Sequence, residues 1–315
     1  MNWILKLKRF GESIKKNVLK KFPSKDDQDN SQWTPLNCCN SGPTLKSDLE
    51  EHLFVCPNCK FNHTINPKTR FDMMFGENNW EEINCPLPPD NPLNFVDSKP
   101  YSDRLKSARK KTGQDCAVLS CVAKINEVEM VVSALNFDFM GASIATSECE
   151  SLIFAIQTAI NNKCSFVLAS ASGGMRMQEG ILSLQSMAKL TIAVNELKKN
   201  NLPFVVLYCA PATAGGTTAS ITSLSDIAMA EEGVTIAFSG KRVVAATVRE
   251  QLDENIQRSD WVLDKGFLDL EVERKDIPNK LYKILSILLK LGTGANKENK
   301  DETSENIVQI TKAAS

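Results

Sequence analysis

Short apolar runs alternate with amphipathic segments along the chain from about residue 103 to residue 291. Four runs predict strands covered on both faces of a sheet: Met130–Phe137, Ser165–Ala169, Phe204–Cys209 and Val234–Phe238. The segments between them repeat apolar residues at spacings of three and four, which predicts helices over about 152–160, 177–200 and 217–224. Repeated strand and helix favour an α/β fold with parallel strands joined by right-handed crossovers.

Small residues end three of these runs, at turns near Gly141, Gly173 and Gly215. A helix that begins after such a turn has unpaired amides and a partial positive charge at its first residues. Two amides aimed at one point form an oxyanion hole, which stabilises the negative charge of an enolate made from a thioester. We therefore predict that Gly173, Gly174, Gly215 and Gly216 supply donors. The alternative for any one pair is a structural turn, because glycine is the default turn residue.

Motifs that are missing from the sequence limit the kinds of catalysis that the chain could perform. Neither the G-x-x-x-x-G-K-[ST] nor the G-x-G-x-x-G spacing of phosphate-binding loops occurs, and there is no G-x-S-x-G elbow. The two histidines, His52 and His63, both precede the α/β region, so a histidine base or a Ser-His triad is excluded there. The catalytic groups that remain possible are backbone donors, carboxylates or a base carried by the substrate.

Composition agrees with a folded enzyme and excludes some other classes of protein. The 315 residues are 42% hydrophobic and 24% charged, and the formal net charge of -1 argues against a generic polyanion binder. The ten cysteines lie mostly in apolar runs, which indicates free thiols in a reducing, cytoplasmic compartment. No apolar stretch reaches the ~20 residues of a membrane span.

Shifts in composition divide the chain into four parts. Residues 1–32 predict a basic helix and a linker, 33–63 a small cysteine-containing unit, 64–291 the α/β domain, and 292–315 a disordered tail. The basic helix has an apolar stripe from Trp3 to Val18. It is interpreted as a solvated helix packed on the body, as a targeting segment, or as a contact with a partner or with nucleic acid.

The chain also contains several specific motifs: Asp97-Ser-Lys-Pro-Tyr-Ser-Asp-Arg-Leu105, Phe139-Met-Gly141, Ser170-Ala-Ser-Gly-Gly-Met-Arg-Met-Gln-Glu179, Ser186-Met-Ala-Lys189, Gln257-Arg-Ser-Asp-Trp261 and Lys265-Gly266. With Met1-Asn-Trp-Ile4 and Cys56-Pro-Asn-Cys59, they resemble the beta-subunit family of the bacterial acetyl-CoA carboxylase carboxyltransferase. The resemblance extends to about residue 291. It implies a crotonase-like (ClpP/crotonase) ββα superhelix with a small N-terminal zinc-ribbon-like unit.

A biotin-dependent carboxyl transfer is the activity that the resemblance implies. In that reaction the carboxyl group passes from carboxybiotin, on the biotin carboxyl carrier protein, to acetyl-CoA. The product is malonyl-CoA, in the first committed step of fatty acid biosynthesis. The biotin ureido nitrogen is the base, which fits an α/β region without histidine. The family builds each site between this subunit and an alpha subunit, as a heterotetramer with two of each, within an ATP-dependent complex that includes a biotin carboxylase.

The predicted substrate-binding residues lie at or after the turns: Met140, Gly141, Arg176, Lys241 and Arg242. Arg176 directly follows the second turn, where its guanidinium has the geometry to pair a CoA phosphate. The alternative for Arg176 is a surface ion pair with Glu179, three positions later. Lys241 and Arg242 are assigned a similar phosphate-binding role.

The cysteine-containing unit departs from the family pattern of two C-x-x-C knuckles. Cys56 and Cys59 form one knuckle, whereas the other reads Asn37-Cys38-Cys39-Asn40. Tetrahedral zinc prefers four thiolate or imidazole ligands. The predicted ligand set is therefore Cys39, Cys56, Cys59 and, as the fourth, Cys38 or one of the two histidines. The alternative is that zinc has been lost and the unit folds by packing alone.

Two further departures concern the glycine turns. Ala142 stands where the family commonly has glycine, and Pro211-Ala-Thr-Ala-Gly-Gly216 has one residue more than the usual Pro-Thr-Thr-Gly-Gly. An insertion beside an oxyanion hole is expected to displace a donor, because such sites tolerate only about 0.5 Å.

Two competing hypotheses remain open at this point. One is another crotonase-type enzyme, such as a hydratase or a different acyl-CoA carboxylase, in which Glu179 is the carboxylate close to a turn. The other is nucleic-acid binding by residues 1–63, where a basic helix precedes the ribbon.

Overall fold

The computed structural model describes residues 33–36, 38–39, 42–248 and 255–290. The predicted basic helix and linker of residues 1–32 and the predicted tail of 292–315 lie outside the described residues. The chain forms two compact units, Met1–Phe61 and Asn62–Ser315. None of the helices in the described ranges is both long and apolar enough to cross a membrane.

In its described residues, the small unit contains a two-stranded antiparallel ribbon and one short helix. Strand β1, Trp33–Pro35, pairs with β2, Pro43–Leu45, and α3 follows at Lys46–Glu51. Among its described residues the core is small: Leu36, Leu49 and Cys56 are buried together. So few apolar contacts stabilise a fold weakly, which makes a metal site a natural second source of stability.

The large unit is built on an eight-stranded sheet in the described ranges. Strands β5, β6, β7, β8 and β10 are parallel, and β3 and β4 extend the sheet as an antiparallel edge. The strand bounds are β3 Trp80–Glu82, β4 Val118–Ile125, β5 Val128–Leu135, β6 Ser165–Ser172, β7 Phe204–Thr213, β8 Ile227–Glu231, β9 Thr235–Ile236 and β10 Leu270–Val272. The predicted parallel arrangement is confirmed, whereas β3, β4, β8 and β10 were not predicted from the sequence.

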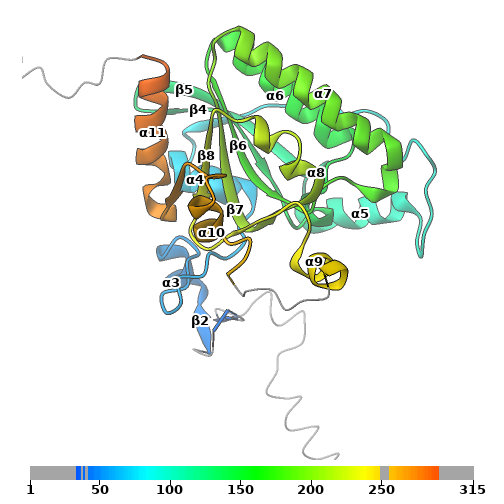
Figure 1. The fold of residues 1–315 in the computed structure, drawn as a ribbon, viewed down its shortest axis with the longest axis horizontal. Helices are drawn as coiled ribbons and strands as arrows, with labels where there is room; N and C mark the ends of the chain where they lie inside the picture. Colours follow the sequence, from blue (N-terminus) through cyan, green and yellow to red (C-terminus); the bar gives the residue numbers. More distant parts are fainter. Residues whose placement is uncertain (1–32, 37, 40–41, 249–254, 291–315) are drawn as a thin grey trace, which may run out of the picture. The chain divides into compact units, whose positions relative to one another are not determined.

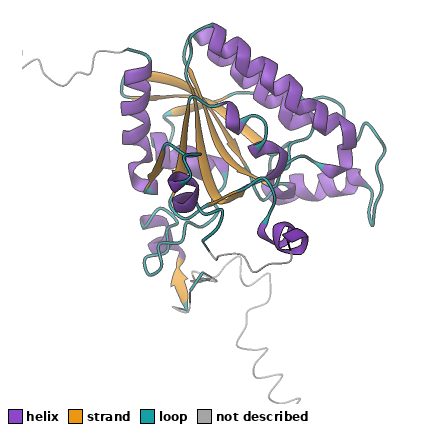
Figure 2. Ribbon diagram, viewed as in Figure 1, coloured by secondary structure: helices purple, strands orange, loops and turns teal. Residues whose placement is uncertain are grey.

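Helices cover both faces of this sheet (Figures 1 and 2). Helices α5, Tyr101–Thr112, α6, Thr146–Asn162, and α7, Gly180–Lys199, pack into one apolar cluster, and α4, Pro67–Phe75, and α11, Ile277–Leu288, pack into the cluster on the other face. Spacings of three and four bring the apolar positions of α6 to one side. The shorter helices are α8 Gly215–Thr218, α9 Lys241–Val248 and α10 Ser259–Asp264.

The parallel strands determine where the glycine turns lie. Strands β5, β6 and β7 run side by side, and each is followed by one of the three turns predicted from the sequence. Since the carboxyl ends of parallel strands lie at the same edge of a sheet, the turns near 141, 173 and 215 come together there.

Candidate active site and candidate metal centre

The three glycine turns contact one another through their backbones. The Gly173 amide donates to the Gly141 carbonyl at 2.8 Å. A Cβ added to Gly174 would lie 3.3 Å from both the Gly215 Cα and the Gly216 nitrogen. A Cβ on Gly216 would lie 2.5 Å from the Met175 Cγ, closer than real Cβ contacts come. Glycine is therefore needed at these positions for close approach, whether or not the amides also act in catalysis.

The structure separates the four predicted donors into two groups. The amides of Gly173 and Gly215 already donate at 2.8 Å, to the carbonyls of Gly141 and Phe238. The prediction that they are available donors is wrong, because each amide has a single hydrogen and these two are used inside the chain. The Gly174 amide has only a longer contact, 3.2 Å to the Ser172 hydroxyl.

Gly216 is the second residue of α8, so its amide has no partner within the helix. The Gly174 amide and the Gly216 amide are thus the two that remain for a ligand. They belong to turns whose backbones contact each other. An oxyanion hole needs two such amides directed at one point.

The first turn has a strained backbone. Met140, Gly141 and Ala142 have consecutive φ values of +52°, +66° and +46°. Residues with a Cβ avoid this left-handed region, and such strain is common at functional sites. Ala142 is fully buried in this conformation.

Arg176 lies in the interior, not at a phosphate-binding surface. Its side chain is 1% exposed and its Nη2 donates to the Glu148 carboxylate at 2.7 Å and to the Ser143 carbonyl at 2.6 Å. Both predictions for Arg176 are therefore wrong: a buried, paired guanidinium cannot meet a CoA phosphate, and its carboxylate partner is Glu148 instead of Glu179.

Glu179 is equally buried, at 3% exposure. Its Oε1 accepts from the Tyr101 hydroxyl at 2.9 Å, and its Oε2 accepts from the Thr146 amide at 2.8 Å. Burial raises the pKa of Tyr101, so the phenol stays protonated and donates. Because both Glu179 oxygens have partners within the chain, this residue is unsuited to the acid–base role that a hydratase requires.

Lys241 and Arg242 begin α9. Their side chains lie outside what the structure describes, so their predicted phosphate-binding role stays a prediction. Sequence reasoning missed Tyr101, Ser143 and Glu148. The available signal for Glu148 is its place in the first turn of α6, where a carboxylate reaches free amides.

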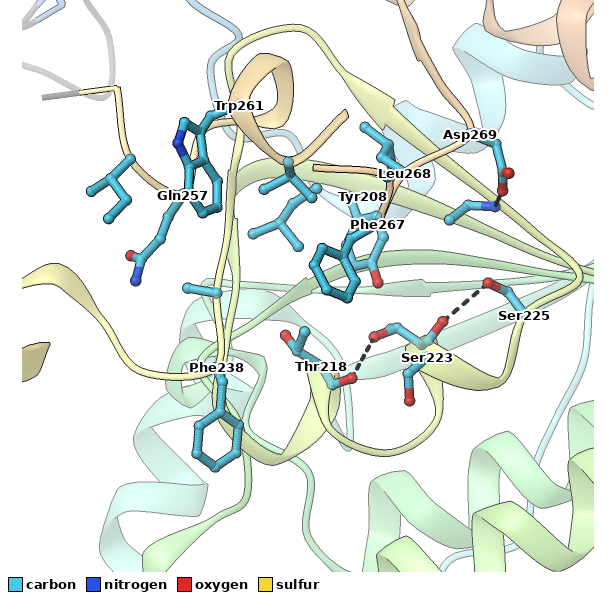
Figure 3. A pocket seen from close by; sticks show the side chains of 17 residues that line it. Tyr208, Thr218, Ser223, Ser225, Phe238, Gln257, Trp261, Phe267, Leu268 and Asp269 are labelled. Carbon is cyan, nitrogen blue, oxygen red and sulfur yellow. Dashed lines mark hydrogen bonds between the residues drawn. The ribbon is translucent and has the colours of Figure 1, made fainter. Parts of the chain in front are cut away.

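A cavity of about 610 Å³ lies beside the third turn (Figure 3). Helix α8 contributes Thr218 to its wall, and Phe238 contributes both a wall and the carbonyl that accepts from the Gly215 amide. Its size falls in the range of small-molecule sites. Aromatic and hydroxyl side chains line much of it: Tyr208, Phe238, Trp261, Phe267, Thr218, Thr222, Ser223 and Ser225.

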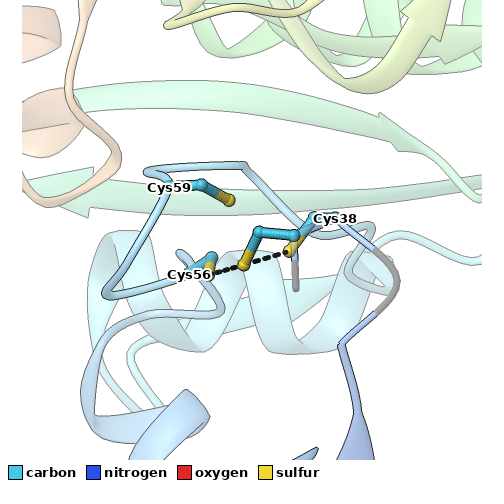
Figure 4. Close-up of side chains that lie close together, drawn as sticks. Cys38, Cys56 and Cys59 are labelled. Carbon is cyan, nitrogen blue, oxygen red and sulfur yellow. Dashed lines mark hydrogen bonds between the residues drawn. The ribbon is translucent and has the colours of Figure 1, made fainter. Parts of the chain in front are cut away.

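The side chains of Cys38, Cys56 and Cys59 in the small unit point toward one another (Figure 4). The Sγ atoms of Cys38, Cys39, Cys56 and Cys59 all lie within 4.8 Å of one another. Cys39 Sγ is 4.0 Å from Cys38 Sγ and 3.8 Å from Cys56 Sγ. A tetrahedron with Zn–S bonds of about 2.3 Å has S···S edges of about 3.8 Å. The donor set and its spacing fit zinc, and adjacent cysteines both reach the cluster.

Comparison with known proteins identifies the family. A carboxyl transferase domain model matches residues 92–274. The acetyl-coenzyme A carboxylase carboxyl transferase subunit beta of Pelagibacter ubique (strain HTCC1062) is 50% identical over 315 residues, 100% of both chains. The protein of the same name from Rhizobium meliloti (strain 1021) is 40% identical over 281 residues, 89% of this chain and 91% of its own. This chain belongs to that beta-subunit family.

Several solved structures share the fold of this chain at low sequence identity. The transcarboxylase 12S structure matches with a TM-score of 0.57 and 16% identity, over 76% of this chain and 42% of that one. A Pseudomonas malonate decarboxylase hetero-tetramer in complex with malonate matches with a TM-score of 0.55 and 16% identity, over 78% and 88%. These matches confirm the predicted crotonase-like carboxyl transferase fold.

Proposed function

We propose that this beta subunit contributes the amides of Gly174 and Gly216 to a carboxyl transfer from carboxybiotin to acetyl-CoA, forming malonyl-CoA for fatty acid biosynthesis. The observation that supports the proposal is the close backbone contact between the second and third glycine turns, which contain these two amides. As the thioester is converted to an enolate, its oxygen gains negative charge, and two fixed N–H donors stabilise that charge.

Carboxybiotin, delivered on its carrier protein, supplies the carboxyl group and the base for the acetyl proton. The chain's own residues bind and orient the thioester and hold the donors in place. The burial of Glu179 supports this division. Because this carboxylate is not available as a base at the turns, the base is expected to come from the biotin. It also weighs against the hydratase alternative.

The proposed assembly is cytoplasmic and is a heterotetramer of two beta and two alpha subunits, which works with the biotin carboxyl carrier protein and the ATP-dependent biotin carboxylase. Phe238 and Phe267 at the rim of the cavity are 66% and 78% exposed. Exposed aromatic side chains of this kind support the proposal that a partner subunit covers this surface.

Nucleic-acid binding by residues 1–63 stays a prediction, since the basic helix lies outside the described residues.

Reconstitution tests the proposed function. We expect malonyl-CoA formation when this chain is mixed with an alpha subunit and carboxylated biotin, and none from the chain alone, because half of each shared site is then missing. Malonyl-CoA is measured by mass spectrometry. Carboxyl transfer by the chain alone, or crotonyl-CoA hydration as its main activity, would contradict the proposal.

The second proposal concerns the metal: Cys38, Cys39, Cys56 and Cys59 bind a structural zinc ion. We expect Cys38→Ser to lower bound zinc at least about tenfold, because hydroxyl oxygen is a much poorer ligand than thiolate. Zinc is measured by inductively coupled plasma mass spectrometry. The matched control is Cys85→Ser, at a cysteine outside the cluster, and it should leave zinc unchanged. Equal zinc in both variants, or none in the wild-type chain, would refute a four-cysteine site.

A further inference from the structure

The strained turn Met140–Ala142 needs support from outside itself. Two of its three left-handed residues carry side chains. A backbone conformation of this kind persists only where the surrounding structure holds it. The turn follows β5, and its Gly141 carbonyl accepts the Gly173 amide, so any drift of the turn also moves the second glycine turn.

One side chain, Arg176, contacts both flanks of this turn. Before the turn, its guanidinium carbon lies 5.6 Å from the centre of the Phe139 ring. After the turn, its Nη2 donates to the Ser143 carbonyl at 2.6 Å and its Nε donates to the Ser143 hydroxyl oxygen at 3.1 Å. The Ser143 hydroxyl in turn donates to the Met140 carbonyl at 3.0 Å. Arg176 thus connects the two ends of the turn.

The guanidinium is itself fixed from the opposite side. Its Nη2 donates to Glu148 Oε1 at 2.7 Å, and its Nη1 donates to the Tyr101 hydroxyl at 3.1 Å. Glu148 is fully buried, and its other oxygen accepts from the Ala145 amide at the start of α6. The planar fork of arginine makes these contacts at once, which lysine cannot do.

We propose that Arg176 is a positioning residue that fixes the Met140–Ser143 turn against the Gly173–Gly174 turn. It touches no reacting atom. It acts through Ser143 and through its own backbone amide, which donates to the Ile144 carbonyl at 2.8 Å. The catalytic consequence rests on the proposed function, whereas the mechanical consequence belongs to the chain alone.

The test is Arg176→Lys, which keeps the charge and removes the fork. In the complex with the alpha subunit, we expect kcat to fall at least about tenfold and the KM for acetyl-CoA to change less than about threefold. In the chain alone, amide hydrogen exchange at Ala142 and Ile144, which donate to Phe139 and Gly174, should become at least about tenfold faster. The matched control is Arg109→Lys, at an arginine that forms a bidentate pair with Asp90 on the exposed surface, and it should change neither.

Two results would overturn the proposal. A raised KM with unchanged kcat would mean that Arg176 contacts the substrate directly. Unchanged exchange at Ala142 and Ile144 would mean that it does not hold the turn. Should Arg176→Lys fail to fold, Tyr101→Phe removes one hydroxyl contact and keeps the ring, so faster exchange at the same amides is still required. If the wild-type complex makes no malonyl-CoA, the proposed function fails, and hydrogen exchange still decides the positioning role.

Discussion

Replacing Gly174 with alanine should reduce carboxyl transfer about 10²- to 10³-fold. Alanine keeps the amide but displaces it, and the loss of one oxyanion donor has an effect of this size. The new Cβ would lie 3.3 Å from the Ala214 carbonyl oxygen, the Gly215 Cα and the Gly216 nitrogen. All three are backbone atoms, so the second and third turns must separate to make room. The φ of +110° at Gly174 adds strain for any residue with a side chain. Malonyl-CoA formation with the alpha subunit is the measurement.

Gly113→Ala is the matched control for this prediction. Gly113 ends α5 with a φ of +68°, and a Cβ there meets nothing within 4 Å. Alanine in this left-handed position lowers stability by about 1–2 kcal/mol but does not approach the turns. We expect Gly113→Ala to retain wild-type kcat. If Gly174→Ala also retains it at a comparable melting temperature, the contact between the turns has no catalytic role.

The parts of the fold that the sequence predicted have strong local signals. Apolar runs gave β5, β6 and β7, and spacings of three and four gave α6 and α7. Strand β8, Ile227–Glu231, was missed because it has one β-branched residue and two alanines. Its strand conformation comes from pairing with β7 and β10, which is tertiary context that a local pattern does not contain.

The site was predicted less well than the fold. The glycine turns were located correctly, but hydrogen bonding to Gly141 and Phe238 removes two of the four expected donors. Arg176 was assigned from its sequence neighbours, yet its partner Glu148 precedes it by 28 residues. Neither fact is visible in sequence spacing, because both depend on how adjacent strands bring distant turns together.

A second buried ionic cluster in the large unit links α4, β7, β8 and Arg274. Glu231, at the end of β8, is 0% exposed. Its Oε1 accepts from Arg70 of α4 at 2.8 Å and from the Nε of Arg274 at 2.9 Å. Its Oε2 accepts from the Nη2 of Arg274 and from the Ala210 amide of β7, both at 2.9 Å. One carboxylate therefore satisfies four donors and compensates two buried cations.

Glu231→Gln should lower the free energy of unfolding by about 3–5 kcal/mol, the usual loss when one partner of a buried ion pair is removed. Glutamine keeps the shape of the side chain but removes its charge, so Arg70 and Arg274 are left as buried cations. Its amide group also places a donor where donors already converge. The free energy of unfolding is measured by urea denaturation of the whole chain, from the transition of the large unit.

The pH dependence of this loss identifies its cause. Burial alone would raise the pKa of Glu231, but attraction by Arg70 and Arg274 lowers it from 4.5 to about 2. Because the pKa is lower in the folded state than in the unfolded state, the ionised carboxylate stabilises the fold at pH values above 4.5. This contribution, about 3 kcal/mol, is lost as the pH falls from 4.5 toward 2. The difference between wild type and Glu231→Gln should shrink over this range. Glu129→Gln, at an exposed pair with Lys124, should change stability by less than about 1 kcal/mol at any pH. A difference that does not vary with pH would mean that packing, and not charge, determines the effect.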